Sequence, residues 1–225
     1  MIKAVIFDMD GLMIDSERVT FEGYKAECGK MGLVMEEEFY KKVLGHTLPE
    51  VFQMFWDKYG KSFPMEEVLE KVHNYMDDVF VRDGVPVKEG LRELLQYLKA
   101  NNYKTVVATS SGRSRVDRIL NMAGLTEYFD GSVCGDEVKN GKPDPEVFLK
   151  ACEKVQAKPQ EALVLEDSEA GISAAYAAGI PVICVPDMKY PEEQFARKAV
   201  KIAASLAVVL EMFEKEGNSC CGSRI

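Results

Sequence analysis

The stretch AVIFDMDG, residues 4–11, decides the expected fold. Four apolar residues lead without alternation into Asp8, which is typical of a strand covered on both faces of a sheet. Asp10 and Gly11 then indicate a tight turn. Alternate residues of a strand share a face, so the carboxylates of Asp8 and Asp10 can point to one place while Met9 points away. Taken alone, a polar strand end before a turn explains these letters equally well.

Four similar apolar runs follow, at residues 105–109, 132–134, 162–167 and 181–185. Helical spacing recurs between them, as at Leu91, Leu94, Leu95 and Leu98. Asp144 before Pro145 predicts the start of one helix, and Ser205 predicts the start of the last. Alternating strands and helices predict an α/β fold, with a Rossmann-like parallel sheet, right-handed crossovers and helices on both faces.

Residues 16–84 interrupt this alternation. They contain no convincing strand, and their apolar residues recur at helical spacings. We therefore expect a helical domain at 16–84, inserted into a core formed by residues 1–15 and 85–216. Residues 84–86 (GVP) would be the return linker, and the small, polar residues 217–225 would be a flexible tail.

Composition narrows the possible function classes. The 225 residues carry a net charge of −9, which disfavours generic binding to nucleic acid because that requires clustered Lys and Arg. We expect a strand rather than a signal peptide at the first residues, and no apolar run is long enough to span a membrane. Six cysteines without metal-site spacing suggest reduced thiols, and we expect a cytoplasmic protein.

Polar residues follow three more of the predicted strands or their loops. Thr109, Ser110 and Ser111 follow the run at 105–109, where hydroxyl and backbone N–H groups can hold phosphoryl oxygens. Lys142 lies in the loop GKPDP, which two prolines stiffen. Singly, each matches an ordinary turn, helix cap or surface lysine.

Glu166 and Asp167 close the run at 162–167 and are followed by Ser168. An acidic pair at the end of a buried strand is costly unless it caps a helix or binds a cation. Capping of the Ala-rich helix at 169–178 explains Ser168 but not both acids. All four motifs belong to one edge of a parallel sheet, where they provide what phosphoryl transfer through an aspartyl phosphate needs.

These ordered motifs resemble those of the haloacid dehalogenase superfamily. The strings DMDGLMIDSE, ATSSGRS, GKPDPEVF and LEDSEAGISAAYAAG are similar to the branch of β-phosphoglucomutase and sugar-phosphate phosphatases. The resemblance covers nearly the whole chain, and it implies that the helical insertion is a four-helix bundle, the cap domain of that branch. Asp10 argues against a true dehalogenase, which lacks this second aspartate.

The resemblance also implies a role for each motif. Asp8 is the expected nucleophile, and Asp10 the acid and base. Thr109 and the Ser110 N–H would hold the phosphoryl group with Lys142. Residues expected to help bind phosphate or substrate are Gly11, Ser111, Arg113, His46 and Lys71. Mg²⁺ would be the cofactor, with the expected ligands Asp8, Asp10 (through its carbonyl), Asp167 and Glu166, the last directly or through water.

The insertion departs from the mutase pattern. The branch's mutases carry a histidine where this chain has Thr20, and an arginine in the segment Gly45–Leu48, which has none. We therefore expect a phosphatase acting on a small phosphorylated metabolite, with β-phosphoglucomutase as the alternative and an inactive phosphometabolite-binding regulator as a third hypothesis. We expect a monomer or weak homo-oligomer.

Overall fold

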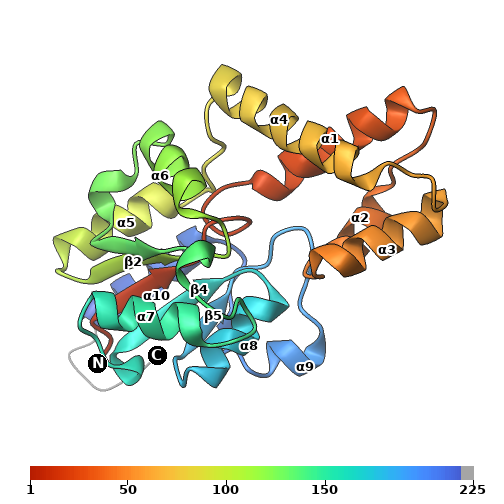
Figure 1. The fold of residues 1–225 in the computed structure, drawn as a ribbon. Coiled ribbons are helices and arrows are strands. Elements are labelled where there is room, and N and C mark those ends of the chain that lie inside the picture. Colours follow the sequence, from red (N-terminus) through yellow and green to blue (C-terminus); the bar gives the residue numbers. More distant parts are fainter. Residues whose placement is uncertain (219–225) are drawn as a thin grey trace. The chain divides into compact units, whose positions relative to one another are not determined.

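The computed structural model describes residues 1–218, with side chains described through residue 215 (Figure 1). The chain divides into two compact units. The sheet unit comprises Met1–Ile14 and the chain from Val87 onward, and the helical unit comprises Asp15–Pro86. The predicted tail at 217–225 falls largely outside the described residues, but its first two residues belong to the last helix, so that helix continues further than expected.

The sheet unit contains the expected parallel sheet, with strand order β3-β2-β1-β4-β5-β6. The α/β fold class is thus confirmed. The strands are β1 (Ala4–Phe7), β2 (Lys104–Ala108), β3 (Gly131–Val133), β4 (Ala162–Glu166), β5 (Val182–Cys184) and β6 (Lys201–Ile202). β6 was not predicted, because two residues at a sheet edge leave no recognisable apolar pattern. All five predicted strands end one residue earlier than expected, which leaves Asp8, Thr109 and Asp167 just beyond their strands.

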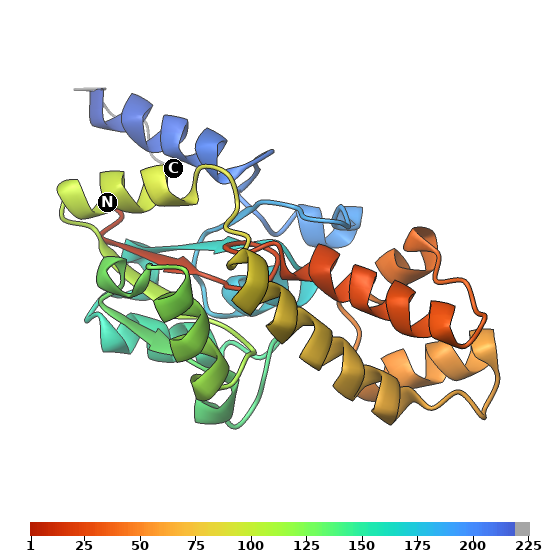
Figure 2. The same ribbon diagram turned by 90° about the horizontal axis from the view of Figure 1, so that it is seen from above.

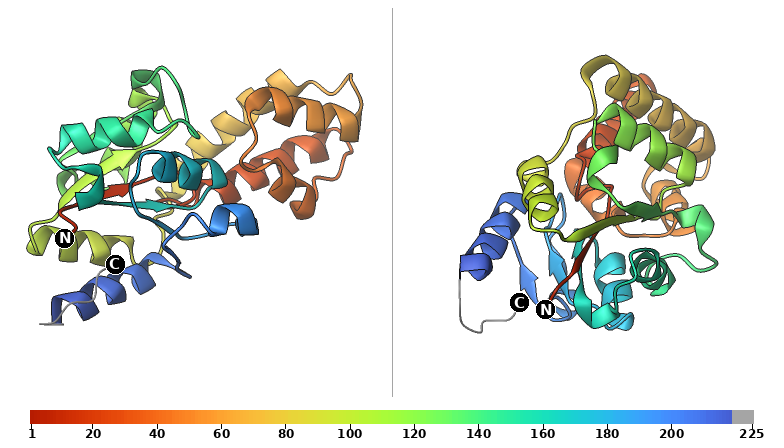
Figure 3. Two further views of the ribbon diagram at one scale, coloured as in Figure 1. Left: turned by 90° about the horizontal axis from the view of Figure 1, so that it is seen from below. Right: turned by 90° about the vertical axis from the view of Figure 1, so that its left-hand side faces the viewer.

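Both faces of the sheet are buried, as the unalternated apolar runs indicated. Figures 2 and 3 show α5 (Leu91–Ala100) and α10 (Leu206–Asn218) side by side on one face. The opposite face packs on α7 (Glu146–Lys154) and α8 (Glu169–Ala177). Ala4 and Ile6 of β1 belong to the core on this second side. Since strand residues alternate, Asp8 continues the same row toward the end of the strand.

Helix starts were predicted with mixed success. The hydroxyl of Ser168 accepts a hydrogen bond from the Gly171 N–H at 3.0 Å, so it caps α8 as expected. Ser205 accepts from the Val208 N–H at the start of α10. The prediction for α7 was wrong by one residue, since Pro145 holds the cap position, while the Asp144 carboxylate accepts from the Glu146 N–H.

The sheet unit has further helical elements. They are α6 (Arg113–Met122), α9 (Glu193–Ala196) and the 3₁₀ helices η1 (Thr126–Tyr128), η2 (Gly135–Glu137) and η3 (Pro159–Glu161). Within residues 1–218, no helix is both long and apolar enough to cross a membrane.

The helical unit, all of whose residues are described, contains four helices and no strand. They are α1 (Ser16–Lys30), α2 (Glu37–Val43), α3 (Leu48–Tyr59) and α4 (Met65–Asp83). α1 packs along α4, and a cluster of aromatic rings forms much of the interior. Phe55 lies at its centre and is fully buried. Its ring contacts those of Tyr24, Phe39, Tyr59 and Phe63.

The two chain passages between the units run side by side. Ile14 forms an antiparallel bridge with Val87, and the Lys88 N–H donates to the Met13 carbonyl at 2.9 Å. On the helical side, the Asp15 N–H donates to the Pro86 carbonyl at 2.8 Å. The residues entering and leaving the helical unit are therefore tied together by backbone hydrogen bonds.

We predict that Phe55→Ala lowers the free energy of unfolding by about 3–5 kcal/mol, because it empties the centre of the aromatic cluster. Phe52 is a matched control on the same helix: it is partly exposed, and its ring pairs with that of Trp56. Phe52→Ala should cost less than about 1.5 kcal/mol. Urea unfolding of both variants measures the difference, and equal losses would contradict this assignment of the core.

Candidate active site

The carboxyl ends of β1 and β4 meet at Gly11. The Gly11 N–H donates to the Ile14 carbonyl, closing the turn after Asp10, and Gly11 has a φ of +82°. A Cβ at this position would lie 2.2 Å from Oδ2 of Asp167. Both the backbone conformation and this close approach require glycine. The predicted glycine thus lets the loop after β1 lie against the loop after β4.

Lys142 joins the three central strand ends. Its ammonium lies 2.5 Å from Oδ1 of Asp8 and 2.7 Å from Oε1 of Glu166, and it donates to the Ala108 carbonyl at 3.1 Å. The three side chains are almost wholly buried, with exposed fractions of 4% for Lys142, 9% for Asp8 and 1% for Glu166. Two of the carboxylates predicted from the sequence, those of Asp8 and Glu166, therefore contact the predicted lysine.

Two buried carboxylates share this one ammonium. Burial raises the pKa of Asp8 to about 7, and Lys142 only partly offsets that effect. Burial by itself would lower the pKa of Lys142, but the charges of Asp8 and Glu166 outweigh it and hold this pKa above its usual value. Lys142 is therefore cationic, while the carboxylates around it lack a full complement of positive charge.

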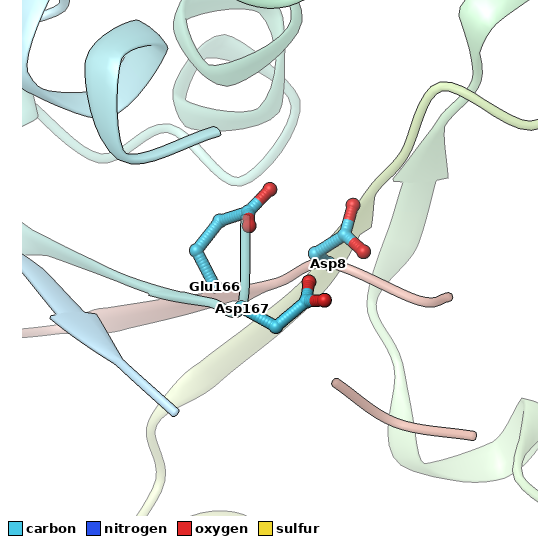
Figure 4. A group of neighbouring side chains, drawn as sticks. All are labelled: Asp8, Glu166 and Asp167. Atoms are coloured by element: carbon cyan, nitrogen blue, oxygen red, sulfur yellow. The ribbon is translucent and has the colours of Figure 1, made fainter. Parts of the chain in front are cut away.

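Asp8, Glu166 and Asp167 form an acidic cluster, shown in Figure 4. One carboxylate oxygen from each lies within 4.8 Å of the others, so the three could hold a metal ion. The cluster offers only oxygen ligands, which suit a hard cation. Glu166 also has structural partners: Oε1 contacts Lys142, and Oε2 accepts from the Ser168 N–H at 2.7 Å.

Asp10 is held by the loop after β2 and by α6. Its Oδ2 accepts from the Ser111 hydroxyl and its Oδ1 from Nη2 of Arg115, both at 2.7 Å. Sequence analysis identified Ser111 but missed Arg115. The spacing could have indicated Arg115, because it follows Ser111 by four residues across the start of α6. Residues with this spacing lie near each other on a helix.

The loop after β2 also borders a small cavity. The Thr109 hydroxyl oxygen accepts from the Ser111 N–H at 3.1 Å, which shapes the loop. The cavity, of about 90 Å³, is lined by Thr109, Ser110, Gly135, Val138, Gly141, Lys142 and Val147. Two of the predicted phosphate-binding residues thus share one pocket with the buried ammonium.

Three predicted substrate-binding residues make other contacts. The guanidinium of Arg113 binds Glu137 and Ser132, and it also contacts Asp117, so it faces β3 and η2. In the helical unit, His46 lies 3.6 Å from Glu50, and the exposed Lys71 lies 2.7 Å from Glu67.

Gly171 on α8 is a second residue that sequence analysis missed. A Cβ there would lie 1.7 Å from Oε1 of Glu166. The glycine therefore lets α8 approach closely enough for Glu166 to reach Lys142. Its only signal in the sequence is a glycine within an otherwise Ala-rich helix.

Comparison with known proteins identifies the family of this chain. Residues 5–185 match the family model of the haloacid dehalogenase-like hydrolases. A phosphorylated carbohydrates phosphatase of Thermotoga maritima is 34% identical over 178 residues, covering 79% of this chain and 82% of the relative. The mitochondrial (DL)-glycerol-3-phosphatase 1 of Arabidopsis thaliana is 30% identical over 214 residues, covering 91% of this chain and 70% of the relative.

A solved structure shares the fold over nearly the whole chain. The crystal structure of β-phosphoglucomutase from Clostridium difficile superposes with a TM-score of 0.73 at 25% identity, covering 96% of each chain. The resemblance seen in the sequence motifs is therefore confirmed by family, relatives and fold. With its four motifs on one edge of a parallel sheet, the chain belongs to the haloacid dehalogenase-like hydrolases.

Proposed function

We propose that the protein is a Mg²⁺-dependent phosphatase that hydrolyses small phosphorylated metabolites, sugar phosphates among them, through an aspartyl phosphate on Asp8. The observation that carries this proposal is the contact of buried Asp8 with Lys142 at the strand ends, beside the cavity of Thr109 and Ser110. The similarity to phosphatases of phosphorylated carbohydrates and of glycerol 3-phosphate supports the substrate class.

In the first half-reaction, a carboxylate oxygen of Asp8 attacks phosphorus and the bond to the leaving oxygen breaks. Lys142 reduces the repulsion between the anionic nucleophile and the anionic substrate. Lys142 is buried and already paired with Glu166, so its ammonium needs to move little during the reaction. The Thr109 hydroxyl and the Ser110 N–H bind phosphoryl oxygens in the cavity beside it.

Asp10 serves both halves of the reaction. As an acid it gives a proton to the leaving oxygen, and as a base it takes one from the water that attacks the aspartyl phosphate. Its hydrogen bond from the Ser111 hydroxyl and its ion pair with Arg115 hold the carboxylate in place for both proton transfers.

The charge of the site fits a divalent cation. The carboxylates of Asp8, Asp10, Glu166 and Asp167 face the cations of Lys142 and Arg115, so full ionisation leaves two negative charges in excess. We propose Asp8, Asp167 and the Asp10 carbonyl as the residues that hold Mg²⁺, with Glu166 acting mainly as the partner of Lys142. When bound, the ion neutralises charge on the phosphoryl group and the nucleophile.

A mutase reaction is less well supported. A mutase has to hold a bisphosphate intermediate and exclude water, which calls for a second phosphate clamp. At the positions where the mutases carry histidine and arginine, this chain has Thr20 and no arginine within Gly45–Leu48. The Thr20 hydroxyl donates to the Ser16 carbonyl, and Leu48 is 59% exposed. We propose that the helical unit selects the substrate and that water is the acceptor.

Asp8→Asn should reduce phosphate release from p-nitrophenyl phosphate by at least about a thousandfold, because the amide is a poor nucleophile of nearly the same shape. The variant should remain folded, since burial already disfavours the charge of Asp8. Phosphate release and thermal unfolding are measured on the same sample. Substantial turnover by a folded Asp8→Asn protein would refute the assignment of the nucleophile.

Removing the metal should abolish turnover reversibly. After treatment with EDTA and buffer exchange, we expect activity to return with Mg²⁺ and to return poorly with Ca²⁺, whose longer bonds and looser coordination misplace the nucleophile. Asp167→Asn should raise the Mg²⁺ concentration needed for half-maximal activity by at least about tenfold. Full activity after exhaustive chelation would rule out the metal requirement.

Gly171→Ala tests whether Glu166 positions Lys142. Alanine improves helix propensity by roughly 1 kcal/mol, but displacing a buried ion pair costs about 3–5 kcal/mol. We therefore expect a net loss of about 2 kcal/mol or more in the free energy of unfolding, together with reduced turnover. Gly29→Ala in α1 is the matched control, because its Cβ would meet no atom within 4 Å. If Gly171→Ala stabilises the protein as Gly29→Ala should, Glu166 does not have this role.

A further inference from the structure

The 3₁₀ helix η2 packs against the loop that carries the proposed phosphoryl-binding groups. β3 pairs in parallel with β2, so the loops that follow these strands leave the sheet at the same edge. The Gly135 N–H donates to the Ser111 carbonyl at 2.9 Å. A Cβ on Gly135 would lie 2.1 Å from the Ser110 carbonyl oxygen and 2.8 Å from the carbon of that carbonyl. The contact between the two backbones therefore requires a residue without a side chain.

A side chain at position 135 would be opposed by the neighbouring backbone and not by its own conformation. Gly135 is the first residue of η2 and has no positive φ, so alanine can adopt its backbone angles. A flexible side chain can avoid a close contact by changing its rotamer, but a peptide unit cannot. An added Cβ would therefore displace the backbone of Ser110 and Ser111.

This stretch of backbone positions two groups of the proposed reaction. The Ser110 N–H would bind a phosphoryl oxygen, and the Ser111 hydroxyl donates to Oδ2 of Asp10 at 2.7 Å. The Ser111 N–H also donates to the Thr109 hydroxyl, so the residues of the loop are linked to one another. A displaced Ser110 would therefore disturb both phosphoryl binding and the orientation of Asp10.

Asp136 and Arg113 fasten the far end of the same loop. Gly112, the residue before α6, has no side chain with which to cap the helix. The Asp136 carboxylate accepts from the Arg113 N–H instead, at 3.1 Å and 3.0 Å from its two oxygens. The Arg113 guanidinium in turn binds Glu137 of η2. Arg113, expected at the substrate, thus ties the loop to η2.

We propose that Gly135 is a positioning residue for phosphoryl transfer. By letting η2 contact the loop after β2, it places Ser110 for the phosphoryl group and Ser111 for Asp10. Asp136 and Arg113 hold the same loop where α6 begins. Gly135 acts through these neighbours, and the inference rests on the proposed phosphatase function.

Gly135→Ala tests the proposal. It should raise the KM for p-nitrophenyl phosphate and the Ki for inorganic phosphate by at least about tenfold, because a hydrogen bond to an anion is lost. Its kcat should fall further for the faster of glycerol 3-phosphate and glucose 6-phosphate than for p-nitrophenyl phosphate, since a poor leaving group needs the proton of Asp10. Gly29→Ala, whose Cβ would meet no atom within 4 Å, should leave these values unchanged.

Variants of Asp136 test the second tie. Asp136→Ala should raise the same two constants by about threefold or more, and Asp136→Asn should recover part of the loss, because an amide oxygen can still accept from the Arg113 N–H. Asp117→Asn is the matched control: Asp117 contacts Arg113 from within α6 and is 62% exposed, so its change should alter neither constant. If Gly135→Ala does not fold, this series decides.

Unchanged KM and Ki in folded Gly135→Ala would overturn the proposal. So would an equal fall in kcat on both kinds of substrate without a change in KM or Ki, which is what a partly inactive sample gives. Failure of the phosphatase function would look different, because the unmodified protein would release phosphate from no substrate. Calorimetric binding of inorganic phosphate in the presence of Mg²⁺ then tests the positioning by itself: Gly135→Ala should weaken it, and equal affinity would contradict the role of Gly135.

Discussion

Three strand ends converge on the ammonium group of Lys142. It contacts Asp8 after β1, the Ala108 carbonyl at the end of β2 and Glu166 at the end of β4. A cation buried to this degree is stable only among anions, and two buried carboxylates are tolerable only around a cation. Asp8, the cavity beside Thr109 and the acidic cluster are therefore placed by one shared electrostatic constraint.

The buried groups around Lys142 carry unequal numbers of positive and negative charges. One ammonium does not balance two buried carboxylates. Burial therefore raises the pKa of Asp8 by more than Lys142 lowers it. A further positive charge beside Asp8 would complete the site, and Asp167 supplies an additional oxygen on that side. The proposed divalent cation would thus offset the protein's own charges as well as those of a phosphate ester.

Asp10 belongs to a second, more accessible layer of the site. Ser111 and Arg115 hold it from the loop after β2 and from α6, and both the carboxylate and the guanidinium are partly exposed. The buried and the partly exposed charges of the site therefore form two distinct groups.

The sequence by itself determined the α/β class, the parallel sheet and the candidates Asp8, Asp10, Thr109, Lys142, Glu166 and Asp167, because apolar runs covered on both faces and polar strand ends are local patterns. Only the tertiary structure decided their partners. Glu166 had been expected as a metal ligand, yet both of its oxygens accept hydrogen bonds, one from Lys142. Arg113 turns toward Glu137, while Arg115, two residues later, reaches Asp10. Two residues along a helix rotate a side chain by more than half a turn, so which arginine meets the site depends on how α6 packs, and no local pattern records that orientation.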